Sequence, residues 1–219
     1  MKRIRSAVVL VLALGLASCD RAREESVARV GNGQESDEVP VLMTLPPFAL
    51  TDQSGAQFGT EALQGKVWVT NFIFTRCMAT CPVQTAQMAQ LQQRLKSHAR
   101  WSDISLVSIS VDPQYDQPSV LQQYARNAGA DERNWRFLTG PREQIWQLSK
   151  EGFKLPVGEN PGSEDMPLFH APHLVLVDWQ GRVRGYYDGL TAEGVERLAR
   201  GLDKVLEEFA PAGTGDVPE

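Results

Sequence analysis

Two cysteines separated by three residues, Cys77 and Cys81, have the types and spacing most able to do chemistry in this 219-residue chain. Pro82 follows directly, and a proline favours the first helical position, so we expect a helix to begin there with Cys81 at or just before its N-cap. The positive end of a helix favours thiolate over thiol. The pair can therefore be a redox dithiol or two ligands of a copper or zinc ion, and the third interpretation is a structural disulfide.

The spacing of the two cysteines bears on these alternatives. Two intervening residues are the usual redox signature, whereas the three found here leave more room for a metal ion between the sulfurs. Met78 lies inside this loop and stays open as a further ligand. Met88 shares helical spacing with other apolar residues, which predicts a position in the core.

The elements that must position this loop alternate between strands and helices. A continuous β-branched and aromatic run, residues 67–74, predicts a buried strand directly before the cysteines. Strands alternating with helices, together with a hairpin near each end, predict an α/β domain with a mixed central sheet flanked by helices. The other expected elements are a hairpin at 48–58, strands at 104–111, 135–140, 173–178 and 183–187, and helices at 82–99, 118–128, 141–152 and 191–209.

The first 19 residues predict export. Three basic residues, an apolar core and small residues before Cys19 form a signal peptide, and the sequence from Leu16 to Cys19 resembles a bacterial lipobox. We expect lipidation of Cys19 and a membrane lipoprotein facing the periplasm. Asp20 resembles an inner-membrane retention signal if the cell is Gram-negative. The alternatives are a plain secretory signal or an uncleaved anchor.

The remaining composition divides the chain into a tether, a domain and a tail. Residues 20–45 are charged and lack apolar periodicity, which predicts a flexible tether. Residues 46–209 are expected to form one domain, and residues 210–219 a disordered tail. The net charge of −5 and the lack of a visible basic patch argue against nucleic acid as a partner.

An ordered set of motifs resembles the Sco/SenC family of thioredoxin-fold copper proteins. The set covers most of the chain from about Pro46 to Phe209. It comprises Asn71–Cys77 with Cys81-Pro82, Ser108–Pro113, Asp116–Leu121, Trp135 with Phe137–Gly140, and His170 before Gly181.

The resemblance implies a copper site made by Cys77, Cys81 and His170. Soft thiolates suit Cu(I), and imidazole accepts either Cu(I) or Cu(II). His173 is the alternative ligand, with a partly buried, hydrogen-bonded side chain as its other interpretation. Asp112 is either a hydrogen-bonding group near the metal or the end of a strand.

The resemblance also implies a function, with alternatives from other classes. The first is a membrane-tethered copper chaperone for the binuclear copper site of cytochrome c oxidase, whose partner is the oxidase copper-binding subunit or another copper chaperone. The second is a thiol–disulfide oxidoreductase that uses Cys77 and Cys81 to reduce the copper-ligand cysteines of the oxidase. A thiol peroxidase ranks third, since it needs further groups around a low-pKa cysteine.

Overall fold

The computed structural model describes residues 39–163 and 166–209. The expectations for the signal peptide, for Cys19 and for residues 20–38 and 210–219 lie outside them. Among the described residues, no helix is both long and apolar enough to cross a membrane. The elements are β1 (Met43–Thr44), β2 (Ala49–Asp52), β3 (Gln57–Gly59), α2 (Thr60–Leu63), β4 (Val67–Ile73), α3 (Thr80–Leu95), η1 (Trp101–Asp103), β5 (Ile104–Ser110), α4 (Pro118–Asn127), β6 (Trp135–Thr139), α5 (Arg142–Gln147), η2 (Leu148–Gly152), β7 (Val157–Glu159), β8 (Leu168–His170), β9 (His173–Val177), β10 (Arg182–Asp188) and α6 (Ala192–Glu208).

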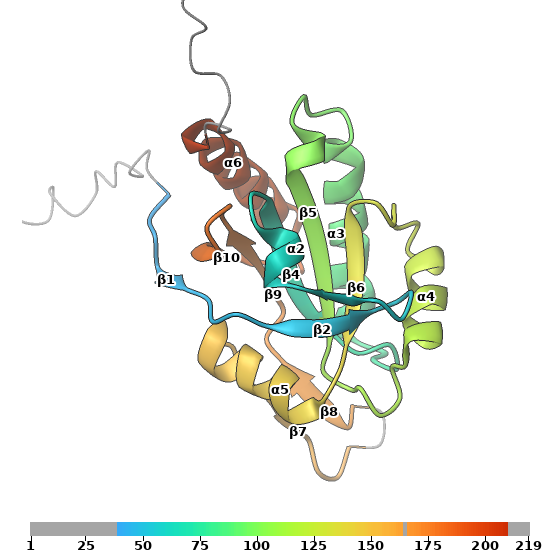
Figure 1. Cartoon of the computed structure of the whole chain (residues 1–219). Coiled ribbons are helices and arrows are strands. Elements are labelled where there is room, and N and C mark those ends of the chain that lie inside the picture. Colours follow the sequence, from blue (N-terminus) through green and yellow to red (C-terminus); the bar gives the residue numbers. More distant parts are fainter. Residues whose placement is uncertain (1–38, 164–165, 210–219) are drawn as a thin grey trace, which may run out of the picture. The chain divides into compact units, whose positions relative to one another are not determined.

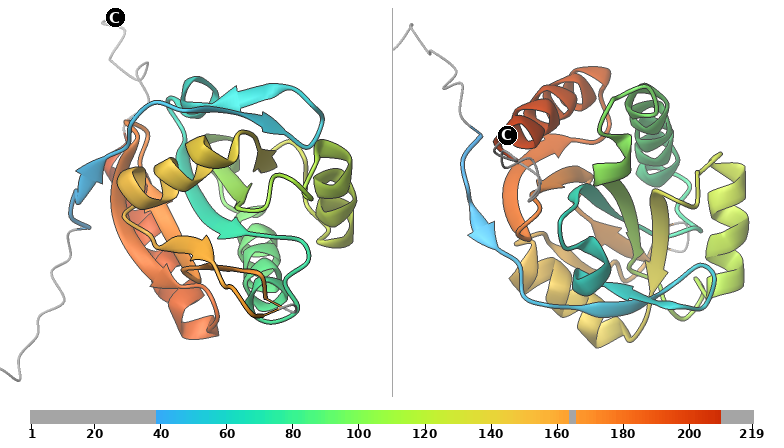
Figure 2. Two further views of the ribbon diagram at one scale, coloured as in Figure 1. Left: turned by 90° about the horizontal axis from the view of Figure 1, so that it is seen from below. Right: turned by 45° about the horizontal axis from the view of Figure 1, so that its top comes forward.

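A mixed eight-stranded sheet forms the centre of the described fold, in the order β1-β10-β9-β4-β5-β6-β2-β3. Strand β4 pairs parallel with β5 and antiparallel with β9, and all seven of its residues are buried. Helices α3 and α6 lie side by side on one face of the sheet, and α5 lies on the other (Figures 1 and 2). The expected fold class, including the hairpins β2–β3 and β9–β10, is confirmed.

Apolar side chains pack on both faces of the central sheet. On the α5 side, Phe153 packs edge-on against Trp68 and Phe72 of β4. On α3, Met88 and Leu91 are fully buried, as their helical spacing predicts. The strand that precedes the cysteine loop is therefore fixed from both faces.

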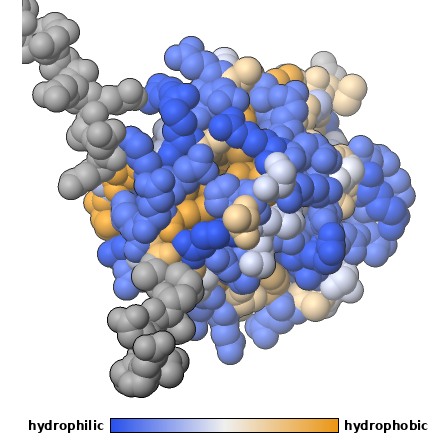
Figure 3. Space-filling view, turned by 90° about the horizontal axis from the view of Figure 1, so that it is seen from above, coloured by the Kyte–Doolittle hydropathy of each residue, from blue (hydrophilic) through white to orange (hydrophobic). Residues whose placement is uncertain are grey.

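The two ends of the sheet differ in chemistry. Where β4 begins, Leu45, Phe48, Trp68 and Trp179 line part of a cavity of about 360 Å³. Figure 3 views the domain from this side and shows hydrophobic surface between polar residues. Among the described residues that line this cavity, none is a cysteine or a histidine. Parallel strands finish at one edge, so the loops after β4 and β5 meet at the opposite end, where the cysteines lie.

Helix α3 begins earlier than we expected, at Thr80 rather than at Pro82, and ends at Leu95 rather than near residue 99. Cys81 is therefore inside the first helical turn. Proline is tolerated there because the N–H groups of the first turn have no partner within the helix. Gln92 of α3 is buried. Its side-chain nitrogen donates a hydrogen bond to the carbonyl of Gly129, and its side-chain oxygen accepts one from the main chain of Asp131.

The sheet also takes in residues that we had assigned to the tether. Met43 and Thr44 form β1 against β10, and the side chain of Leu45 is buried. Arg184 of β10 donates hydrogen bonds to the main-chain carbonyls of Val39 and Pro40. Main-chain pairing and one buried arginine thus hold a segment whose composition alone resembles a linker.

Strands β7 and β8 were not expected. They form a separate two-stranded antiparallel sheet in which His170, the last residue of β8, pairs with Val157. Figure 2 shows this hairpin beside α5, at the end of the domain seen from below. His170 therefore belongs to a paired strand and lies three residues before His173, where β9 begins. Three-residue strands are too short to produce a periodic pattern in the sequence.

Candidate metal centre

The two cysteines lie at the junction between β4 and α3. Cys77 is in the loop, its main-chain N–H donates to the carbonyl of Phe74 at 3.1 Å, and its residue is 3% exposed. Cys81 is 0% exposed, and its main-chain N–H donates to the Cys77 sulfur at 3.5 Å. Both thiols are free. The loop therefore presents an adjacent pair of buried sulfurs.

His170 meets this pair from the β7–β8 hairpin. Its Nε2 lies 3.1 Å from the Cys81 sulfur, and its Nδ1 lies 3.1 Å from the carbonyl of Ala171. Because a carbonyl only accepts, Nδ1 carries the proton and Nε2 keeps its lone pair directed at the sulfur. The ring of Phe74 packs edge-on against the imidazole at 5.9 Å between centroids, which fixes the orientation of the ring.

The thiols differ in their protonation. Burial raises the pKa of Cys77, but hydrogen bonds from the main chain of Cys81, Ala79 and Thr80 outweigh it and the net pKa is lowered. For Cys81, burial dominates and raises the pKa. Cys77 is thus the readier thiolate, and Cys81 the thiol that holds its proton.

Burial also lowers the pKa of His170, which keeps the imidazole neutral. A neutral imidazole is the form that binds metals, and its free lone pair is the one facing Cys81.

His173, the alternative ligand, lies in a different environment. Its main-chain carbonyl accepts a hydrogen bond from Gln84 at 3.2 Å, and its ring packs edge-on against Tyr186 at 6.4 Å. No interaction in the described structure joins its ring to either cysteine. The geometry therefore brings His170 to the sulfurs and leaves His173 at the start of β9.

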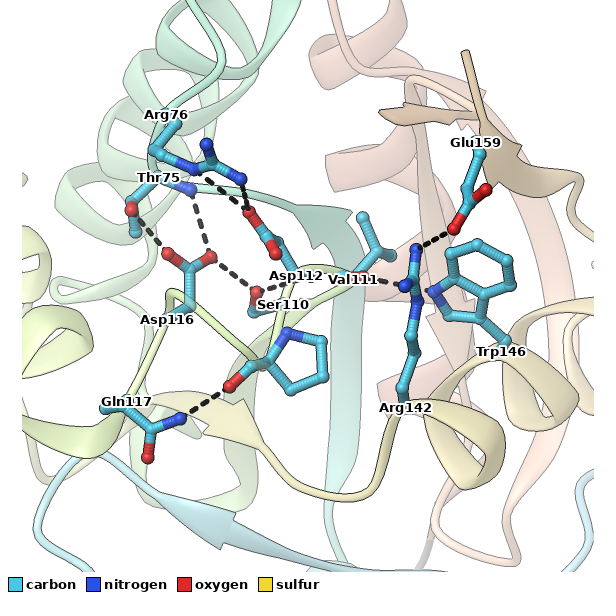
Figure 4. A network of polar contacts seen from close by, with 11 residues as sticks. Thr75, Arg76, Ser110, Val111, Asp112, Asp116, Gln117, Arg142, Trp146 and Glu159 are labelled. Carbon is cyan, nitrogen blue, oxygen red and sulfur yellow. Dashed lines mark hydrogen bonds and ion pairs between the residues drawn. The ribbon is translucent and has the colours of Figure 1, made fainter. Parts of the chain in front are cut away.

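A buried carboxylate supports the loop, and the sequence analysis gave it no role beyond a place in the motif Asp116–Leu121. Asp116 is fully buried and accepts hydrogen bonds from the hydroxyls of Thr75 and Ser110 and from the main chain of Thr75 (Figure 4). Burial raises its pKa. The available signal was its position two residues before Pro118, which begins α4.

Asp112, which we considered a hydrogen-bonding group near the metal, contacts Arg76 instead. Two guanidinium nitrogens donate to one carboxylate oxygen at 2.6 and 3.1 Å (Figure 4). The guanidinium also lies over the ring of Tyr115 at 4.7 Å. Asp112 therefore acts on the cysteine loop through Arg76, the residue before Cys77.

The donor set fits a soft metal, although it is not arranged as a closed cage. Two thiols and one neutral imidazole suit Cu(I). Within residues 39–163 and 166–209, no three His, Cys, Asp or Glu side chains converge closely enough to hold an ion. The close pairs are Cys81 with His170 and Cys77 with the main chain of Cys81. The 3.1 Å between the Cys81 sulfur and His170 Nε2 is a hydrogen-bond distance, so the donors must rearrange to hold an ion among all three.

The fold and the site define a thioredoxin-like dithiol domain. The SCO1/SenC family model matches residues 38–207, and the chain belongs to this family. A relative from Stutzerimonas stutzeri, named "Putative copper-binding protein", is 31% identical over 93% of this chain and 95% of its own length.

Two solved structures of Sco family proteins are similar to this chain in fold and sequence. A SCO1/SenC family lipoprotein from Bacillus anthracis has a TM-score of 0.69 and 36% identity, covering 75% of this chain and 95% of that one. BsSco, described as having a disulfide switch and as a member of the Sco family of cytochrome c oxidase assembly proteins, has a TM-score of 0.66 and 31% identity, covering 77% and 96%.

Proposed function

We propose that this protein is a copper-binding metallochaperone for the assembly of the binuclear copper site of cytochrome c oxidase. The observation that carries the proposal is the 3.1 Å approach of His170 Nε2 to the Cys81 sulfur, beside a second buried thiol. The copper-binding name of the Stutzerimonas stutzeri relative and the oxidase-assembly role given for BsSco support it.

In this proposal, copper is cargo held by Cys77, Cys81 and His170. The two thiols lose their protons as they bind the ion, and His170 donates through Nε2. Delivery is a ligand exchange with the oxidase copper-binding subunit or with another copper chaperone. A lipid on Cys19 would keep the domain at the membrane, facing the periplasm. The lipoprotein described from Bacillus anthracis supports the lipid attachment.

A Cu(I) titration of the reduced protein in oxygen-free buffer tests this function. The wild type is expected to bind one ion, and Cys77→Ala, Cys81→Ala and His170→Ala to bind it more weakly. His173→Ala is the matched control, because it removes a neighbouring histidine that does not contact the cysteines. The proposal is wrong if the three variants keep wild-type stoichiometry and affinity.

The second candidate function, a thiol–disulfide oxidoreductase, is favoured by the different pKa shifts of the two thiols. The Cys77 thiolate would attack a partner disulfide and form a mixed disulfide, releasing one partner thiolate. Cys81 would then lose its proton and attack the Cys77 sulfur, which leaves a Cys77–Cys81 disulfide and a reduced partner. Exchange with a model disulfide peptide that survives in His170→Ala would support this activity, and its absence in the wild type would eliminate it.

A further inference from the structure

The proposed ligands are poorly placed to meet an ion that arrives from solvent. Cys77 and Cys81 are 3% and 0% exposed, and the metal-binding nitrogen of His170 faces the Cys81 sulfur. A Cu(I) ion must leave its previous ligands before it can reach these atoms. A soft donor at the surface would give the ion an intermediate position.

Met78 is such a donor. Its side chain is 83% exposed, although it lies directly between Cys77 and the start of α3. In the described part of the chain it is the only exposed residue that contains sulfur, because the other methionines and both cysteines are buried or half-buried. The other exposed large apolar residues there, none with a soft donor, are Val41, Leu42, Val83, Tyr115 and Phe169.

The chemistry of a thioether matches this position. Thioether sulfur is a soft ligand that suits Cu(I), and methionine can turn about three side-chain bonds. Consecutive Cα atoms lie about 3.8 Å apart, so the exposed Met78 side chain starts one residue from the buried Cys77. An apolar side chain this exposed contributes nothing to the core, in contrast to Met88, which is 0% exposed in α3.

We infer that the Met78 thioether is the entry ligand that captures Cu(I) and passes it to the buried thiols. The inference rests on the proposed copper function. A bond from copper to the thioether forms as the donor ligand leaves. Each thiol then loses one proton to solvent as its bond to copper forms, and the thioether is released. The ion stays Cu(I) throughout, so no electron is transferred.

Stopped-flow mixing of the reduced full-length protein with the Cu(I) complex of bicinchoninate tests the inference through the loss of the complex's colour. Met78→Leu keeps an apolar side chain of similar size but lacks sulfur. We expect capture to slow by about tenfold, equivalent to about 1.4 kcal/mol of activation free energy. The matched control is Val83→Ala, which removes an exposed apolar group from the first turns of α3 without removing a soft donor.

A spectroscopic measurement tests the same bond without relying on rates. In selenomethionine-labelled protein frozen during capture, copper X-ray absorption is expected to show a selenium neighbour, which is lost in labelled Met78→Leu.

Equal capture rates in the wild type and Met78→Leu, or equal slowing in Val83→Ala, would overturn the role of Met78. Failure of the wild type to take up copper would instead overturn the proposed function itself, so the two failures are distinguishable.

Discussion

The candidate site joins two parts of the molecule that are held very differently. Cys77 and Cys81 follow β4, which pairs with neighbours on both sides in the eight-stranded sheet. His170 belongs to β8, whose sheet, as far as the described residues show, contains one other strand and three residue pairs. Regions with fewer contacts open at lower free energy than the core does. The cysteine half is therefore preorganised, and the histidine half is the part that can adjust when copper binds.

Removal of a cysteine should have the largest effect on copper affinity. Cys81 contacts both His170 and Cys77, so Cys81→Ala should weaken Cu(I) affinity by more than about 100-fold, beyond the effect usual for residues that only support a ligand. His170→Ala should cost less, because the thiol pair remains in place. Competition with a Cu(I) chelator measures both variants. A larger loss in His170→Ala than in Cys81→Ala would contradict a preorganised cysteine half.

Substituting one phenylalanine in each region shows how much each region contributes to the free energy of unfolding. Phe153 is fully buried against Trp68 and Phe72, so Phe153→Ala should lower the free energy of unfolding by about 3–5 kcal/mol. Phe169 in β8 is 44% exposed, so Phe169→Ala should change it by less than about 0.5 kcal/mol. Urea denaturation measures both. Similar losses would show that the hairpin is as firmly packed as the core.

The buried carboxylate below the cysteine loop predicts a dependence of stability on pH. The pKa of Asp116 is raised by burial, so its stabilising contribution is complete below its ordinary pKa of 3.8 and is lost as pH rises through the raised pKa. Asp116→Asn cannot ionise and should remove this part of the dependence, at a cost of about 1–3 kcal/mol from disturbed hydrogen bonds. Urea denaturation at several pH values measures it.

Asp131 is the control for the sign of this effect. The side-chain hydrogen bond from Arg133 holds the pKa of Asp131 at about 2, so its contribution is present above its ordinary pKa and is lost as pH falls toward about 2. Asp131→Asn should therefore remove a loss of stability at acidic pH. If both variants changed the pH dependence in the same direction, the assigned environment of Asp116 would be wrong.

The smallest effect is expected at the ion pair that joins the hairpin to α5. Arg142 lies 3.0 Å from the carboxylate of Glu159 in β7, and the carboxylate is largely exposed. Arg142→Gln should change global stability by less than about 1 kcal/mol. Amide hydrogen exchange should nevertheless become faster in β7 and β8 and stay unchanged in β4. Unchanged exchange in the hairpin would mean that other contacts hold it.

Most of the fold could be predicted because its long elements have clear periodicity. The apolar run of β4 and the helical spacing of Met88 and Leu91 each predicted burial, and these residues are buried. The elements that were missed, β1, β7 and β8, have two or three residues each and depend on main-chain pairing with distant segments. Sequence pattern over so few residues carries no comparable signal.

Only part of the candidate site could be predicted from the sequence. The family resemblance named Cys77, Cys81 and His170 as donors, with His173 as the alternative. The hairpin that brings His170 to Cys81 was not predicted. The role of Asp116 was missed because its partners, Thr75 and Ser110, come from loops and strands that only the folded chain brings together. Local residue types indicate possible chemistry, whereas burial and partners come from the tertiary structure.

The most direct measurement is X-ray absorption on the Cu(I)-loaded protein, which counts the sulfur and nitrogen neighbours of the ion. Copper held by Cys77, Cys81 and His170 predicts two sulfurs and one nitrogen, with the nitrogen lost in His170→Ala and kept in His173→Ala. A copper ion with no sulfur neighbour, or a nitrogen that disappears only in His173→Ala, would contradict this assignment.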